Sequence, residues 1–313
     1  MSGEIKQLLL IPHIKVHNAN ALSSPFTIGF PAMTAWLGAT HALQRKLNTA
    51  GFDTLKFNAT AIISHRCDLQ THKGVGDYVH SIIGTGNPLD KTGSRSAFIE
   101  EARCHLDVSL LIDYSGATKD DEEQLLDRIT HFLNANMKIA GGDILDFNSP
   151  TAIKIEQGNE KDLRKLTRKL MPGYAIVERR ELMQEAMKQG QDAIDALLDY
   201  LAIHHSCDQD DDGNVSWTSN RKTAGWIVPI ATGFHGISEL GTAKNQRDPD
   251  TPHRFAESVV TLGEFKMPHR IKSINEILWH YQVKEQQNLY LCENNTIELT
   301  ENQEVNELSE LFI

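Results

Sequence analysis

The sequence predicts an α+β fold, and three observations lead to that class. Stretches of alternating or β-branched apolar residues recur through the chain, as in half-buried strands. Two segments instead place their apolar residues at a helical period. The chain has 313 residues, 40% of them hydrophobic and 23% charged, which is ordinary for a globular protein with a sizeable core.

The first half predicts six elements in the order β-α-β-β-α-β. The helices begin with favourable residues, Pro31 in the first turn of one and acidic side chains in the first turn of the other. The expected elements are, in order, Leu8–Ile14, Pro31–Leu47, Thr54–Ser64, Arg103–Tyr114, Asp121–Met137 and Ala152–Ile155. This order is the ferredoxin-like pattern, which RNA-recognition folds share, so residues 1–156 are expected to form a ferredoxin-like core.

The second half predicts three further regions. Residues 157–206 read as a helical insertion, with one helix around Leu163–Leu170 and a longer one over Glu178–His204 that Gly190 weakens. Residues 207–292 return to strands, turns and glycines, and residues 293–313 form an acidic tail.

The distribution of charge along the chain weakens the argument that its negative net charge excludes nucleic-acid binding. A net charge of −11 argues against nucleic-acid binding when taken alone. However, residues 1–50 carry four basic side chains against one acidic, and residues 214–272 carry eight against five. The acidity is concentrated in residues 114–213 and 273–313. The sequence therefore predicts local contact with a short strand and repulsion of nucleic acid elsewhere.

Targeting and redox features favour the cytoplasm. No apolar run approaches 18 residues and the start MSGEIKQ lacks a signal-peptide layout, so no membrane association is expected. The four cysteines are scattered without a CxxC pair and read as reduced thiols.

Residues 15–27 are rich in small polar side chains and contain no carboxylate. Such a loop suits phosphate oxygens and unstacked base edges. The alternative is an ordinary strand-to-helix connection in which Asn and Ser form local turns. The candidate RNA-binding residues here are Lys15, His17, Asn18, Asn20, Ser23, Ser24 and Thr27.

The segment 214–272 supplies a second candidate group. Cations next to an aromatic ring can neutralise phosphates while the ring stacks on a base, and Arg side chains near rigid turns suit phosphate. The candidates are Arg221, Lys222, Trp226, Arg247, Arg254 and Arg270. Alternatives remain: Trp226 in the apolar string GWIVPI could belong to the core, Arg247 could pair with Asp248 or Asp250, and Arg254 could pair with Glu257.

Metal and cofactor motifs are not found. The chain has 14 histidines but no HExxH motif or His/Cys ligand spacing. Residues 208–213 copy the first half of a calcium loop, yet Ser219 stands where the bidentate Glu is needed. No metal or cofactor is therefore expected. No motif places a histidine beside a second catalytic group, so catalysis is not indicated either.

Three long strings carry a resemblance to a known family. They are LLIPHIKVHNANALSSPFTIGFPAMTAWLG, GWIVPIATGFHGIS and RDPDTPHRFAESVVTLGEFKMPHR, and the likeness spans most of residues 6–281. The chain resembles the Cas-five-type (second Csy) subunit of type I-F CRISPR surveillance complexes, which belongs to the RAMP superfamily. The resemblance implies a RAMP core.

The resemblance also implies a function in antiviral defence. Such a subunit would be non-catalytic, would bind the 5′ handle of the CRISPR RNA, and would pair with the large Cas-eight-type Csy subunit. It would abut Cas-seven-type backbone subunits and reach target double-stranded DNA through the complex. Two alternatives stay open: a metal-independent endoribonuclease using His17 or His65 as general acid or base, and a protein-binding scaffold that does not touch RNA.

Overall fold

Strand β1, Ile5–Asn20, is the longest of the described strands and lies third from one end of the main sheet. The computed structural model describes residues 5–84, 89–94, 101–209, 213–244, 246, 248 and 250–294. The predicted Arg247 site and all but the first two residues of the acidic tail lie outside these ranges.

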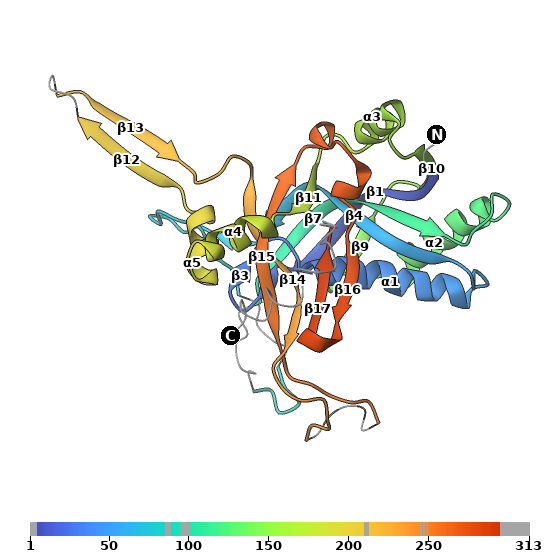
Figure 1. Cartoon of the computed structure of the whole chain (residues 1–313). Coiled ribbons are helices and arrows are strands. Elements are labelled where there is room, and N and C mark those ends of the chain that lie inside the picture. The colour runs from blue at the N-terminus through green and yellow to red at the C-terminus, as the bar shows by residue number, and fades with distance from the viewer. Residues whose placement is uncertain are drawn as a thin grey trace.

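The elements follow one another along the chain as shown in Figure 1. The helices are α1 (Met33–Thr49), α2 (Glu122–Asn136), α3 (Glu160–Lys169), α4 (Arg180–Lys188) and α5 (Ala193–Leu201), with short 3-10 turns at Pro268–Arg270, Ile274–Glu276 and Glu285–Gln287. The remaining strands are β2 (Leu22–Ser24), β3 (Thr27–Ile28), β4 (Lys56–Leu69), β5 (Thr71–His72), β6 (Ser81–Ile82), β7 (Arg103–Ser115), β8 (Lys138–Ile139), β9 (Gly142–Asp146), β10 (Thr151–Glu156), β11 (Tyr174–Glu178), β12 (His204–Gln209), β13 (Val215–Asn220), β14 (Ile227–Gly236), β15 (Ala256–Lys266), β16 (His280–Lys284) and β17 (Leu289–Glu293).

Eleven of the described strands form one large antiparallel sheet, and β2–β3, β5–β6 and β12–β13 form three separate pairs. Its order is β16-β17-β14-β15-β11-β4-β7-β1-β9-β8, and β10 pairs with the other end of β1. The main sheet therefore joins strands from both halves of the chain, with β11 and β15 as the link.

The six elements predicted for the first half are confirmed in type and order. The predicted strand at 8–14 is part of the longer β1, and the predicted helix at 31–47 is α1, which begins two residues later. Strands β4, β7 and β10 and helix α2 each match a predicted segment to within a few residues.

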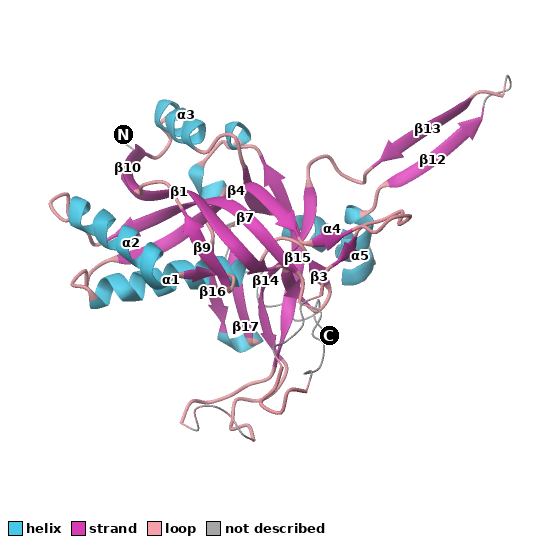
Figure 2. Cartoon of the chain, turned by 180° about the vertical axis from the view of Figure 1, so that it is seen from behind, coloured by secondary structure: helices cyan, strands magenta, loops and turns pink. Residues whose placement is uncertain are grey.

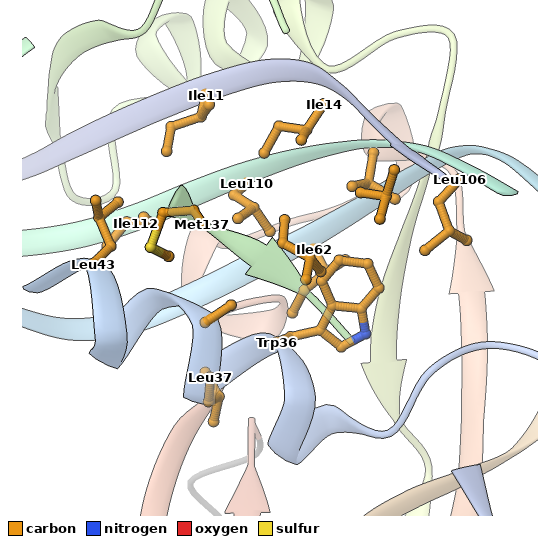
Figure 3. Close-up of a cluster of buried hydrophobic side chains, with 14 of the residues drawn as sticks. Ile11, Ile14, Trp36, Leu37, Leu43, Ile62, Leu106, Leu110, Ile112 and Met137 are labelled. Carbon is orange, nitrogen blue, oxygen red and sulfur yellow. The ribbon is translucent and has the colours of Figure 1, made fainter. Parts of the chain in front are cut away.

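The sheet is buried on both faces where β1, β4 and β7 meet. Along β1, Leu9 and Ile11 belong to one buried cluster with residues of α1 and α2. Figure 3 shows Ile11 and Trp36 of this cluster from close by. Leu8 and Leu10 point to the opposite face, toward α3. This alternation is the period of two that a strand imposes, and it fixes which side chains reach each face.

The expectation that residues 157–206 are helical is only partly correct. Residues 174–178 form β11, which pairs with β4 and β15 inside the main sheet. The predicted long helix is two helices, because Gly190 adopts a left-handed φ of 95° that ends α4. Asp192 then caps α5 with its side chain.

Strands β12 and β13 form a two-stranded ribbon that extends away from the rest of the molecule (Figures 1 and 2). Every residue of both strands is exposed, and Trp217 has 71% of its surface accessible. An isolated hairpin is at best marginally stable in water.

Candidate nucleic-acid interface

Lys15 and His17 lie near the end of β1 beside carboxylates from two neighbouring strands. Lys15 is paired in register with Asp107 of β7 and Asp146 of β9, and its Nζ lies 3.0 Å from an Asp146 carboxylate oxygen. This hydrogen bond and charge raise the pKa of Lys15. The loop that lacks carboxylates in sequence is therefore flanked by them in space. Since both side chains are exposed, this ion pair contributes little to stability.

Asn20 makes a local turn contact, as the alternative reading of this loop predicts, whereas the side chain of Asn18 contacts a residue far along the chain. Asn18 adopts a left-handed φ of 62°, and its Oδ1 accepts a hydrogen bond from Gln70 Nε2 at 2.8 Å. Asn20 Oδ1 accepts from the backbone N–H of Leu22 at 2.9 Å. These amide oxygens are thus engaged within the protein.

The Ser and Thr side chains of this loop hold a small hairpin together. Thr27 Oγ1 lies 2.8 Å from Ser23 Oγ and 2.7 Å from Ser24 Oγ, and Ser24 and Thr27 are buried. The hairpin β2–β3 presents Phe26 at its tip with 82% of its surface exposed. Sequence reasoning missed Phe26, although a Ser-Ser-Pro-Phe turn is a recognisable way to display an aromatic ring.

A cavity of about 490 Å³ brings together three of the predicted residues. Arg221, Trp226 and Arg270 come from the segment before β14 and the turn after β15. The cavity is lined by Tyr174, Arg221, Gly225, Trp226, Glu264, Phe265, Met267 and Arg270. It therefore combines two guanidinium groups with aromatic rings, the chemistry expected of a site for a single nucleic-acid strand.

Trp226 is not a core residue, so that alternative is wrong. Half of its surface (51%) is accessible, and its ring packs against Tyr174 (centroids 5.2 Å apart) and Phe265 (5.1 Å). Phe265 in turn meets Phe30, which stacks on the buried Trp36. A continuous series of aromatic contacts thus fixes the exposed indole to the hydrophobic core.

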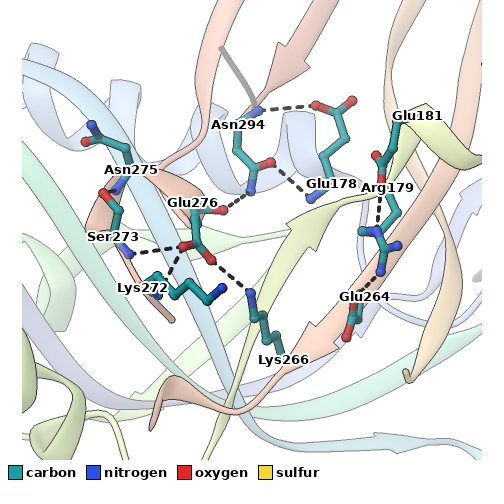
Figure 4. A network of polar contacts seen from close by, with 10 residues as sticks. All are labelled: Glu178, Arg179, Glu181, Glu264, Lys266, Lys272, Ser273, Asn275, Glu276 and Asn294. Atoms are coloured by element: carbon teal, nitrogen blue, oxygen red, sulfur yellow. Dashed lines mark hydrogen bonds and ion pairs between the residues drawn. The ribbon is translucent and has the colours of Figure 1, made fainter. Parts of the chain in front are cut away.

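The acidic member of the cavity, Glu264, is paired with a cation. Arg179 bonds to Glu264 and to Glu181, as Figure 4 shows. Gly225 has a φ of 114°, and a Cβ at this position would lie 2.8 Å from a Glu264 carboxylate oxygen. Glycine is thus required where the chain passes the carboxylate and turns into β14.

Two other predicted cations are engaged elsewhere. Lys222 forms an ion pair with Asp199 of α5, and its Nζ lies 4.4 Å from the centre of the Tyr200 ring. Arg254 donates from Nη1 to Asn288 Oδ1 at 2.6 Å, in place of the alternative pairing with Glu257. Both side chains therefore have structural partners.

The predicted site residues do not all lie close to one another. In the β14–β15 pair, Ile227 faces Glu264 at the cavity end and Gly236 faces Ala256 at the other end. Arg254 lies beyond that second end, away from Trp226. The β2–β3 hairpin does contact β14, and the chain leaving it reaches Phe265 through Phe30. The loop at residues 15–27 and the cavity around Trp226 are thus linked by packing contacts, mainly between aromatic residues.

Comparison with known proteins adds a decisive observation. Residues 9–292 match a family described as the CRISPR-associated protein Csy2. The chain is also 35% identical over 309 residues to the CRISPR-associated protein Csy2 of Pseudomonas aeruginosa (strain UCBPP-PA14), covering 90% of this chain and 94% of that protein. The chain belongs to the Csy2 family.

The match to the Csy2 family includes every candidate residue named above, from Lys15 to Arg270. It ends at residue 292, so the acidic tail lies beyond it. Across the described part of this Csy2-family chain, none of the helices combines the length and apolar character needed to cross a membrane.

The fold also brings histidines together in a way that the sequence does not reveal. His13 Nδ1 lies 3.0 Å from an Asp107 carboxylate oxygen, and the His13 and His65 rings stack with centroids 4.2 Å apart. No sequence motif of this Csy2-family chain places a histidine beside a second catalytic group, but the fold sets His13 beside Asp107 and against His65. No motif could show this arrangement, since the three residues lie on three different strands.

Proposed function

We propose that this chain is a non-catalytic, RNA-binding subunit of a type I-F CRISPR surveillance complex and that it binds the 5′ handle of the CRISPR RNA. Membership of the Csy2 family supports the assignment to such a complex. The observation that carries the RNA-binding role is the cavity in which Arg221 and Arg270 flank the half-exposed Trp226.

The mechanism is physical recognition of a bent single strand. Arg221 and Arg270 neutralise successive phosphates, and Trp226 stacks on an unpaired base. Phe26, at the tip of the hairpin that contacts β14, offers a second stacking face. Lys15 contributes a further phosphate contact once it releases Asp146. Base–aromatic stacking tolerates any base, so sequence preference would come from polar groups around the cavity.

The first half of the chain is proposed to be a ferredoxin-like RAMP core. Its strands β10, β1, β7 and β4 are antiparallel neighbours in that order, and α1 and α2 join them in a β-α-β-β-α-β sequence. This arrangement supports the assignment. The boundaries at residues 156, 206 and 292 are part of the same proposal.

The partners are proposed to be the large Cas-eight-type subunit and the Cas-seven-type backbone subunits, with target DNA bound through the complex. The β12–β13 ribbon is the described segment that most needs a protein neighbour, because all of its residues are exposed. Trp217 and Val215 supply apolar surface there, with 71% and 56% of their surfaces accessible. We assign the ribbon to a subunit interface in the cytoplasmic complex.

A charge-reversal experiment tests the RNA-binding site. Arg221→Glu combined with Arg270→Glu is compared with Arg45→Glu combined with Arg128→Glu, which changes the net charge equally but on α1 and α2. Handle-RNA affinity is measured against salt concentration in the assembled complex. The cavity variant should weaken binding and reduce the slope of log K against log salt by about 0.7 per lost phosphate contact. Equal effects from the two variants would contradict the site.

The endoribonuclease alternative makes a different prediction. The His13–Asp107 pair is the observation that favours it, since a carboxylate beside an imidazole can orient a general base. If that alternative were correct, the purified chain would cleave repeat RNA in the presence of a chelator, and His13→Ala would abolish cleavage. A non-catalytic subunit leaves the RNA intact.

A further inference from the structure

Three polar side chains gather on one face of the central strands, and none of them belongs to the lining of the cavity around Trp226. Leu106, Val108 and Leu110 of β7 face the core formed with α1 and α2, whereas Leu111 belongs to the opposite face. Asp107 shares that opposite face. His13 of β1 and His65 of β4 join it there, and the possible metal-binding atoms of the three residues lie within 4.8 Å of one another.

Two β-bulges place His13 and His65 beside Asp107. The pairing of β1 with β7 shifts register between Ile11 and Ile14, and that of β4 with β7 shifts between Ser64 and Arg66. His13 and His65 fall within these bulges, on either side of β7. Bulges re-aim side chains and are over-represented beside functional sites. His13 also has a φ of 51°, a conformation that is uncommon for residues other than glycine.

The hydrogen bonds of His65 define its tautomer. Its Nδ1 lies 2.5 Å from the Pro172 carbonyl oxygen, which can only accept, so Nδ1 carries the proton. The lone pair is therefore on Nε2, which lies 2.7 Å from Ser109 Oγ. Burial lowers the pKa of His65, which keeps the ring neutral. Metal-binding histidines typically donate their other N–H to a backbone carbonyl or carboxylate in this way.

We propose that His13, His65 and Asp107 form a binding site for a divalent transition-metal ion of the zinc class. Two imidazoles and one carboxylate are a set that zinc accepts, with a water or a ligand oxygen in the remaining position. His13 Nδ1 and the Asp107 carboxylate are already 3.0 Å apart, close to the roughly 3.3 Å between ligands of a tetrahedral zinc ion. The candidate ligand atoms of the three residues already lie within 4.8 Å of one another, so a bound ion would draw them together while His65 keeps its hydrogen bond to Pro172.

The surrounding charges are compatible with a cation. Lys15 is the register partner of Asp107, but its ammonium group is held by Asp146. Ser109 Oγ accepts the backbone N–H of His13 at 3.0 Å and so holds the bulge in place. The bound ion would link β1, β4 and β7, and through Pro172 the segment leading into β11.

Metal titration of the full chain, in its purified complex if it requires partners, tests the site. Zn²⁺ affinity is measured by competition with a chromophoric chelator, and Co²⁺ is used as a spectroscopic probe. We expect one equivalent of Co²⁺ to give the strong visible bands of a four-coordinate site. Asp107→Asn keeps the size and can still accept the His13 hydrogen bond, yet it should weaken Zn²⁺ binding at least 10-fold.

The matched control is His105→Ala, since His105 stacks on His17 on the same two strands at 4.5 Å. It should leave Zn²⁺ affinity unchanged. His65→Ala should abolish binding if the variant keeps its circular dichroism spectrum, and Asp107→Asn decides the question if it does not. Equal Zn²⁺ affinity in all variants, or the absence of visible Co²⁺ bands in the native chain, would overturn the proposal.

Discussion

Trp226 packs edge-on against Tyr174, with ring centroids 5.2 Å apart and an interplanar angle of 81°. The two residues come from different strands of the sheet or their flanks, and Phe265 supports the indole from a third. An aromatic side chain held this firmly loses little conformational entropy when a base stacks on it. The exposed half of Trp226 is therefore a preorganised surface.

The first prediction concerns stacking on Trp226. Trp226→Ala should cost about 1–3 kcal/mol of handle-RNA binding free energy, because it removes one base–aromatic contact. Trp226→Phe should recover part of that loss, since a smaller ring still stacks. Fluorescence anisotropy with labelled handle RNA, on the assembled complex, measures both. Loss of affinity in both variants to the same extent would argue against stacking.

The second prediction concerns the hairpin tip. Phe26→Ala should leave the midpoint of thermal unfolding nearly unchanged, because Phe26 is 82% exposed. The same variant should weaken handle-RNA binding by about 1–3 kcal/mol if the ring stacks on a base. Paired measurements of unfolding and RNA affinity separate the two effects. Unaltered RNA affinity would remove Phe26 from the interface.

The third prediction concerns the attachment of the C-terminal segment to the sheet. Trp279 is fully buried, donates from Nε1 to the Ile176 carbonyl at 2.9 Å, and exchanges two backbone hydrogen bonds with Thr60. Trp279→Ala should lower the free energy of unfolding by about 3–5 kcal/mol. Trp217→Ala, on the exposed ribbon, should change it by about 0.5 kcal/mol or less. Denaturant titration distinguishes the two variants.

The fourth prediction concerns pH. Burial, partly opposed by the hydrogen bond to Pro172, holds the pKa of His65 below its ordinary value of 6.5. As the pH falls through about 6.5 the unfolded chain takes up this proton before the folded chain does, so stability present above that pH is lost below it. His65→Gln should reduce the fall in Tm between about pH 7.5 and 5.5. Calorimetry with a chelator present measures the difference, and an undiminished fall would exclude His65 as its source.

The pattern of apolar residues within each segment was sufficient to predict the helices and main strands of the first half of the chain. The alternation in β7 and the apolar stripe of α2 are read within a single element, and each specifies its own secondary structure. Strand β11 was not predicted, since its residues fall almost entirely between the two helices expected for residues 157–206. Only its pairing with β4 and β15 makes it a strand.

The candidate site depended on contacts between distant residues. Lys15 meets Asp146 across 131 positions of the chain, and no reading of residues 15–27 alone reveals that carboxylate. Trp226 sits in an apolar string, yet the left-handed φ of Gly225 turns the chain so that its ring stays at the surface. The sequence therefore predicted three residues that the fold brings to one cavity, Arg221, Trp226 and Arg270, but not the partners of the other candidate residues.

The central claim is that the cavity around Trp226 and the hairpin tip at Phe26 hold the 5′ handle of the guide RNA. Photo-crosslinking of the assembled complex, with a photoreactive nucleotide at each handle position in turn, followed by mass spectrometry, tests it most directly. The account predicts crosslinks from handle nucleotides to the peptides that contain Trp226 and Phe26. Handle crosslinks confined to α1 and α2, or to other subunits alone, would contradict it.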